Sequence, residues 1–143
     1  MRHRDEAGNA VVEFIWLGLL LLVPLVYVLI AVFDVQRGAF GVSAAARAAG
    51  RAYTLADDIA AAERRAQEAA RVALADQGID GPFSLEIDCA PRPCLSPGSV
   101  TTVRVSAQVT LPLAPDALGG GRPSFRVESV HRVPLGRYVE ARP

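Results

Sequence analysis

The hydrophobic pattern divides the chain into three parts with different periods, and the first is a long unbroken apolar run. From Phe14 to Phe33 every residue is apolar, Gly or Pro. A helix needs about 20 such residues to cross a hydrocarbon core of ~30 Å. A core helix of a soluble domain rarely lacks a polar face over that length. The pattern therefore predicts one transmembrane helix, which ends where Asp34 closes the run.

Helical composition continues beyond the apolar run. The segment from Ser43 to Ala52 is rich in strong helix formers and contains no Pro, so we expect one rod that extends to about Tyr53. A Pro inside a membrane helix is expected to kink the helix rather than end it. Gly38, Gly41 and Gly50 are small residues that let helix backbones approach closely, which suits helix–helix packing. We assign packing positions in this rod to Gly18, Pro24, Gly38 and Gly41.

A second, amphipathic helix is predicted after a short break. Thr54 and Asp57 are both suitable N-caps, and Asp58 favours the positive end of the helix. From about Asp58 to Gln77, apolar side chains recur at helical spacing and charged ones occupy the other sides. Gly78 is a suitable C-terminal stop.

The remaining sequence has a period of two, which is typical of half-buried β-strands. Alternation is visible from Phe83 to Cys89, from Val103 to Leu113 and, less regularly, from Phe125 to Val133. Loops rich in Pro and Gly separate these segments at 90–98 and 114–123.

We therefore predict a membrane-anchored α+β fold, in which the second helix packs on a three-stranded antiparallel sheet. The expected organisation is a leader at 1–8, a transmembrane helix and stalk at 9–53, and a head at 54–143.

The two cysteines add a constraint on the compartment. Cys89 and Cys94 have four residues between them, which suits either a small disulfide loop or two free thiols. A zinc site would need more ligands, and both histidines lie far away in the sequence. A disulfide would place the head in an oxidising compartment outside the cytosol.

Charge and motifs exclude several function classes. Lys+Arg and Asp+Glu are each 15, so no net positive field is available for nucleic acid, and we expect no nucleic-acid partner. Ser129 and His131 share a strand face, but no nucleophile-elbow motif surrounds them. We expect neither enzymatic activity, nor a cofactor, nor a metal site.

The N-terminal segment could instead be a cleaved secretory signal. Signal peptides have apolar cores of 7–15 residues with a small-residue site directly after them. The run here is longer, and the nearest such site, around Ser43, follows a polar stretch. A retained span is therefore the preferred interpretation. Arginines lie on both sides of that span, so the positive-inside rule does not orient it.

Glu13 is the unusual residue, because a carboxylate at the edge of hydrocarbon is costly unless it is paired or neutralised. It could simply lie at the headgroup level. However, Gly8 followed by Glu13 five residues later and by a long apolar helix resembles the prepilin peptidase motif of type IV pilin-like proteins. The resemblance implies cleavage after Gly8 and a mature chain that begins at Asn9. It also implies that Glu13 meets the N-terminal amine of a neighbouring subunit.

A narrower resemblance covers about residues 4–53. The run Ala10-Val-Val-Glu-Phe14, the leucine-rich span and the segment from Ala45 to Arg51 resemble the TadE-like family. These are minor pilin-like proteins of tight-adherence (Flp) pilus systems. Trp16, Gly18 and the distance of Pro24 from Glu13 depart from the family pattern.

The family resemblance implies a structural, pseudopilin-like subunit of the bacterial inner membrane, with a cytoplasmic N-terminus and an extracytoplasmic head. Its implied partners are the membrane lipid bilayer, other pilin-like subunits, the pilus assembly machinery and prepilin peptidase. The alternative is an unprocessed single-pass adaptor with an extracytoplasmic binding domain. Cleavage after Gly8 distinguishes the two.

Overall fold

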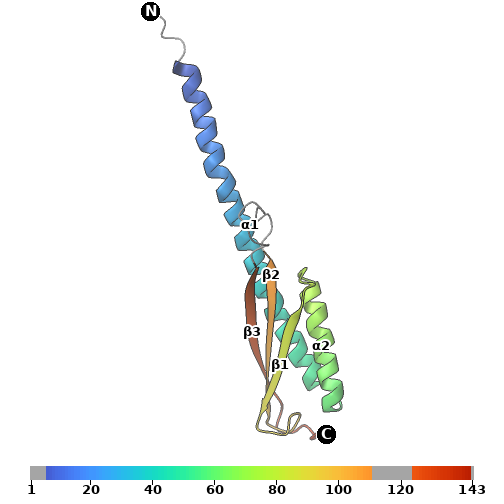
Figure 1. The fold of residues 1–143 in the computed structure, drawn as a ribbon. Helices are drawn as coiled ribbons and strands as arrows, with labels where there is room; N and C mark the ends of the chain where they lie inside the picture. The colour runs from blue at the N-terminus through green and yellow to red at the C-terminus, as the bar shows by residue number, and fades with distance from the viewer. Residues whose placement is uncertain (1–5, 111–123, 143) are drawn as a thin grey trace, which may run out of the picture.

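A computed structural model describes residues 6–110 and 124–142 of the chain (Figure 1). The elements are two helices followed by three strands: α1 (Glu6–Thr54), α2 (Ile59–Ala75), β1 (Phe83–Ala90), β2 (Val100–Thr110) and β3 (Ser124–Pro134). The α+β composition and the order of elements predicted from the sequence are confirmed. The expected strand positions 111–113 and the loop at 114–123 lie outside the described residues.

The first helix is continuous over 49 residues, from Glu6 to Thr54. At 1.5 Å per residue this gives a rod of about 73 Å. Pro24 lies inside the helix and does not end it, as the sequence predicted. The N-terminal half of α1 protrudes, whereas the C-terminal half lies along the other elements (Figure 1).

The second helix begins and ends at residues that satisfy its free backbone groups. Asp58 is the N-cap, and its side chain accepts a hydrogen bond of 2.7 Å from the backbone N–H of Ala61. At the other end Gly78 has a φ of +70°, which closes the helix through a bond of 2.8 Å from its N–H to the carbonyl of Ala75. The predicted stop at Gly78 is confirmed, but the N-cap is Asp58 and neither Thr54 nor Asp57.

The three strands form an antiparallel sheet in the order β1-β2-β3. Phe83 pairs with Ala107, and Val103 pairs with His131. The alternation read from the sequence gives the correct face, because Val103 and Val105 are buried while Arg104 is exposed.

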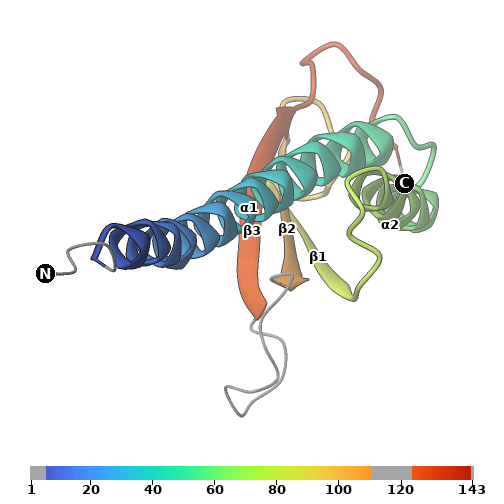
Figure 2. The ribbon, with the colours of Figure 1, turned by 90° about the horizontal axis from the view of Figure 1, so that it is seen from above.

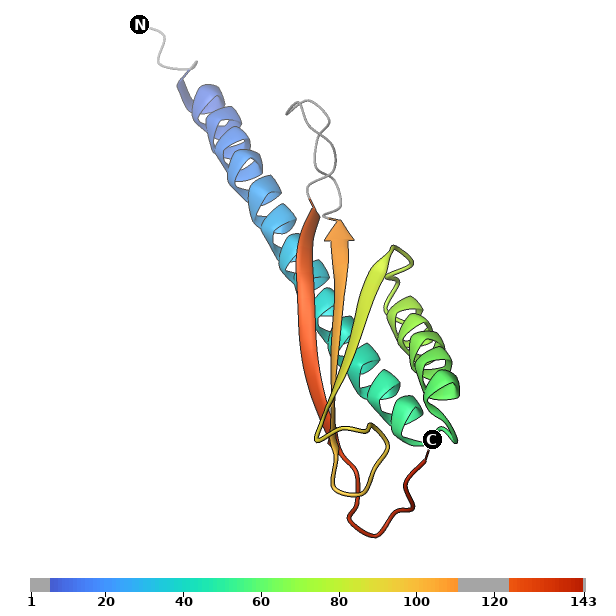
Figure 3. The ribbon, with the colours of Figure 1, turned by 60° about the horizontal axis from the view of Figure 1, so that its bottom comes forward.

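The layering differs from the expected arrangement in one respect. The sequence suggested that the sheet packs on the second helix, but the helix that lies directly against β2 and β3 is α1. Figures 2 and 3 show α1 crossing the sheet, with α2 beside it on the side of β1. The two helices form one layer and the sheet forms the other.

The hydrophobic core crosses the expected boundary between stalk and head. It includes five residues of α1, namely Val42, Ala45, Ala46, Ala49 and Tyr53, together with α2 residues and the inner face of the sheet. The C-terminal half of α1 is therefore an integral part of the head and not a separate stalk.

Candidate functional site

The protruding half of α1 exposes an apolar surface that no described part of the head covers. Exposure reaches 78% for Phe14, 70% for Leu21 and 67% for Phe33. Among the described residues, α1 is the one helix that is long and apolar enough to cross a membrane. Side chains this apolar are unfavourable in water, and they are compatible with a single-pass anchor.

The residues of the predicted processing motif lie at the start of this helix. Gly8 and Asn9 belong to the first turns of α1. Glu13 follows Gly8 by five residues, about 7.5 Å along the helix axis. It is exposed between Val12 and Phe14, and no residue in the described ranges forms a salt bridge with it.

The four predicted packing positions fall into two groups. Gly18 has no heavy atom within 4 Å of the place where a Cβ would be, and Pro24 is exposed. Gly38 and Gly41 instead face the head of their own chain. A Cβ on Gly38 would lie 2.6 Å from Val109 Cγ2, and one on Gly41 would lie 2.7 Å from Ile79 Cδ1. These two glycines allow close packing within the chain, so their Cβ sides are not open to another helix.

Gly50, which the sequence grouped with Gly38 and Gly41 as a residue of close approach, has the same role. A Cβ there would lie 2.8 Å from Val133 Cγ2 of β3. The sequence predicted close approach to another helix, whereas the element that packs against Gly50 is the sheet.

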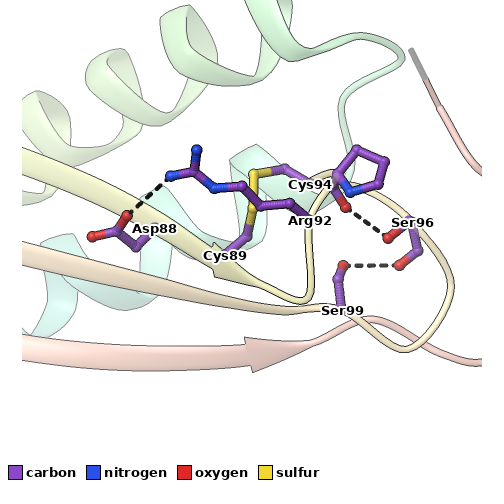
Figure 4. The surroundings of a disulfide bond; sticks show 7 residues. Asp88, Cys89, Arg92, Cys94, Ser96 and Ser99 are labelled. Carbon is purple, nitrogen blue, oxygen red and sulfur yellow. Dashed lines mark hydrogen bonds and ion pairs between the residues drawn. A yellow bond between two sulfur atoms is a disulfide. The ribbon is translucent and has the colours of Figure 1, made fainter.

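Cys89 and Cys94 form a disulfide with a Cα–Cα distance of 5.5 Å, so the free-thiol alternative does not apply (Figure 4). Cys89 lies near the end of β1, and the bond closes the start of the loop to β2. Leu95, directly after the bond, is buried in the core and has a φ of +58°. Ser99 Oγ donates to the carbonyl of Ser96 at 2.8 Å within the same loop. The disulfide therefore helps to hold a loop that contributes a core residue.

The C-terminal segment joins this loop to the turn between the helices, a connection that the sequence did not predict. Arg142 Nη1 donates to the carbonyls of Thr54, at 3.0 Å, and Ala56, at 2.8 Å. Its backbone N–H donates to the carbonyl of Leu95 at 3.3 Å. A guanidinium is well suited to the free carbonyls at a helix C-terminus. These contacts gather at the end of the head opposite the protruding half of α1 (Figure 3).

One titratable group in the head is clearly perturbed. Burial of Tyr53, with a smaller contribution from the negative charge of Glu63, raises the pKa of the Tyr53 hydroxyl.

The outer face of the sheet carries Arg104 between Glu86 and Glu128. These side chains are exposed, and such pairs contribute only about 0–1 kcal/mol each.

Comparison with protein-family models, with curated proteins and with solved structures finds no match to this chain. The fold and its exposed surfaces define an α+β protein with a long apolar N-terminal helix, which is compatible with a single-pass membrane anchor.

Proposed function

We propose that this chain is a minor pilin-like subunit of the TadE type, with a structural role in a tight-adherence pilus or a related secretion system. The observation that carries the proposal is the division of α1. Its first half is an exposed apolar rod that begins with the Gly8–Glu13 motif, and its second half is built into the head.

The continuity of α1 supports a structural role. An uninterrupted helix whose C-terminal half belongs to a packed core ties the head to the rod. In an assembly of packed rods, such a subunit would present its head in a defined place. An adaptor on a flexible linker would not need this rigid connection.

Glu13 provides the chemistry for assembly between subunits. A carboxylate on an apolar helix is stabilised in low dielectric when a cation neutralises it. Cleavage after Gly8 would create a new amine on Asn9, and the amine of one subunit could pair with Glu13 of the next. The pair would place two opposite charges inside a bundle of apolar helices.

The disulfide supports the proposed orientation. A bond between Cys89 and Cys94 persists in an oxidising compartment, which favours an extracytoplasmic head and a cytoplasmic leader at the bacterial inner membrane. In that topology the leader would be available to prepilin peptidase. The proposed partners are the lipid bilayer, other pilin-like subunits and the pilus assembly machinery.

The alternative function is that of an unprocessed single-pass adaptor, whose head contacts an envelope partner. The exposed apolar rod would serve equally well as its anchor. In that case Glu13 would be an interfacial carboxylate with no role in assembly.

The N-terminal mass of the membrane-extracted protein, with and without prepilin peptidase, tests the proposal. We expect a mature chain that starts at Asn9. This mature form should disappear when the peptidase is absent, or when Gly8→Leu makes the cleavage site too bulky for the active-site cleft of the peptidase. Gly18→Leu is the matched control, because it places the same side chain at an open position of the span. If the chain keeps its leader in the presence of the peptidase, the proposal fails and the unprocessed adaptor is the supported function.

A second variant separates processing from assembly. Glu13→Gln removes the charge and keeps the size of the side chain. We expect it to be cleaved normally but to be lost from sheared filament fractions. Normal incorporation of this variant would contradict the role proposed for Glu13.

A further inference from the structure

A groove lined by both polar and apolar residues lies at the base of the head, where α1 leaves the apolar run. The groove, here called the base groove, has a volume of about 400 Å³. Its walls come from α1, from the segment after α2 and from the end of β2. The polar side chains that line it are Asp34, Arg37, Gln77, Asp80, Gln108 and Thr110. Figure 3 shows the end of β2 and the segment after α2 at the level of the middle of α1.

The depth of the base groove follows from the position of the apolar run. Phe33 is the last residue of that run, and Asp34 and Arg37 follow it by about 1.5 Å and 6 Å along the helix axis. The headgroup layer on each side of a bilayer is roughly 5–7 Å thick. When the apolar run fills the hydrocarbon core, the base groove therefore opens within the headgroup layer.

The charges of the base groove are of both signs. One guanidinium, that of Arg37, shares it with the carboxylates of Asp34 and Asp80. In the described ranges none of the three takes part in a salt bridge. Charges that face a groove without pairing across it are suited to a ligand that also carries both signs.

The guanidinium of Arg37 lies near the turn after α2. The place where a Cβ would be on Gly78 lies 3.9 Å from Arg37 Nη1, so the guanidinium rests against this turn. Arginine matches the geometry of phosphate with two parallel N–H donors. Carboxylates match an ammonium group, which has only donors.

We propose that the base groove binds the headgroup of a zwitterionic phospholipid with a primary amine, that is, of the phosphatidylethanolamine type. Arg37 donates to the phosphate, and Asp80 and Asp34 accept from the ammonium group. A choline headgroup offers no N–H donor, and a glycerol headgroup offers no cation. The inference rests on the membrane insertion of α1 in the proposed function, and it is independent of pilus assembly.

Native mass spectrometry of the full chain in detergent tests this binding. The chain is mixed with equal amounts of phosphatidylethanolamine, phosphatidylcholine and phosphatidylglycerol of the same acyl chains. We expect phosphatidylethanolamine adducts to exceed each of the others roughly threefold to tenfold, as for one or two exposed charge-assisted contacts. Equal adducts of all three lipids would overturn the proposal. A preference for phosphatidylglycerol would also overturn it, because Arg37 would then be a simple anion site.

Two variants assign the contacts to residues. Arg37→Gln should reduce adducts of every phospholipid, whereas Asp80→Asn should reduce only the preference for the amine over choline. Both side chains are exposed, so folding should persist, and circular dichroism checks this. Arg64→Gln, on the exposed side of α2 and outside the groove, is the matched control. If Arg37→Gln and Arg64→Gln change the amount of lipid adduct equally, the lipid binds elsewhere and the proposal is overturned.

Alkaline extraction of vesicles made from the same lipids separates this inference from the proposed function. A chain that is released with peripheral proteins is not inserted, and both proposals fail. A chain that stays in the membrane but shows no preference for phosphatidylethanolamine overturns the headgroup site alone.

Discussion

Gly50 of α1 lies against Val133 of β3 so closely that a Cβ on Gly50 would be 2.8 Å from Val133 Cγ2. Non-bonded carbon atoms prefer separations of about 3.5–4.0 Å. Gly38 meets Val109 of β2 in the same way, at 2.6 Å. The absence of side chains at these two positions lets α1 approach the sheet closely, and the apolar rod and the head become one packed unit.

Gly50→Ala should destabilise the head. The added methyl group must displace Val133, and such overpacking costs about 1–3 kcal/mol, more than the gain of roughly 1 kcal/mol in helix propensity. Thermal unfolding of the full chain in detergent, followed by circular dichroism, should show a lower Tm. Gly18→Ala is the matched control, because its Cβ would meet nothing within 4 Å. An equal rise of Tm in both variants would show that the contact relaxes freely.

Arg142→Ala should loosen the distal end of the head. The variant loses the two hydrogen bonds from the guanidinium to the carbonyls of Thr54 and Ala56. For a partly buried charged donor we expect a loss of about 1–2 kcal/mol in the free energy of unfolding. Hydrogen exchange should become faster in the turn between the helices. Arg137→Ala, at an exposed position of the same segment, serves as the control. Unchanged exchange in the Arg142 variant would count against this bridge.

Removal of the disulfide should have a modest effect on stability, because the loop is short. Cys89 and Cys94 are separated by 5 in sequence. Loop-closure entropy for a ring of this size corresponds to about 2 kcal/mol. The Cys89→Ser/Cys94→Ser variant should therefore fold with a lower Tm. Reductant should lower the Tm of the native chain and leave the Tm of the variant unchanged. If reductant also lowers the Tm of the variant, the fall in Tm does not come from reduction of this disulfide.

Thr101→Val should stabilise the protein. Thr101 is fully buried in β2, and its Oγ1 has no hydrogen-bond partner among the described residues. Valine has nearly the same shape and removes the desolvated hydroxyl, so we expect a gain of about 1 kcal/mol. Thr102→Val, on the outer face of the same strand, should give no comparable gain. Denaturant unfolding measures both, and destabilisation by Thr101→Val would imply that the hydroxyl has a partner.

The burial of Tyr53 should make the head sensitive to alkali. Because the folded state raises the pKa of this hydroxyl above its usual value of 10.0, the neutral form is favoured. The corresponding stability is fully present below the unfolded pKa and is lost as the pH rises through the folded one. The sequence contains no Lys, so lysine titration does not obscure this range. Tyr53→Phe should flatten the decline of Tm above pH 10, and Tyr138→Phe, at a fully exposed position, is the control. Identical alkaline profiles for the two variants would contradict this assignment.

Local patterns in the sequence were sufficient to predict the secondary structure. The period of two from Phe83 to Cys89 identified β1 and its inner face, because successive strand side chains point to opposite sides. Gly78 marked the end of α2, since a left-handed stop depends on the chemistry of a single residue. Several neighbouring residues can act as N-caps, so the choice of Asp58 over Thr54 and Asp57 was left to the structure. The cysteine spacing allowed the disulfide but did not decide it against free thiols.

The candidate site was predictable only in part. Gly8, Asn9 and Glu13 were found through a motif, and the structure leaves their role in processing as a prediction. Gly38 and Gly41 were recognised as packing positions, but their neighbours are Val109 and Ile79 of the same chain.

The sequence by itself determined the apolar rod, the two helices and the alternation of the strands, because each depends on residues close together in the chain. Only the tertiary structure decided that the sheet lies on α1, that Gly50 faces Val133 and that Arg142 reaches the carbonyls of Thr54 and Ala56. These contacts join residues far apart in sequence. Many positions of an alanine-rich helix are equally small, and close packing against the sheet selects which of them are buried.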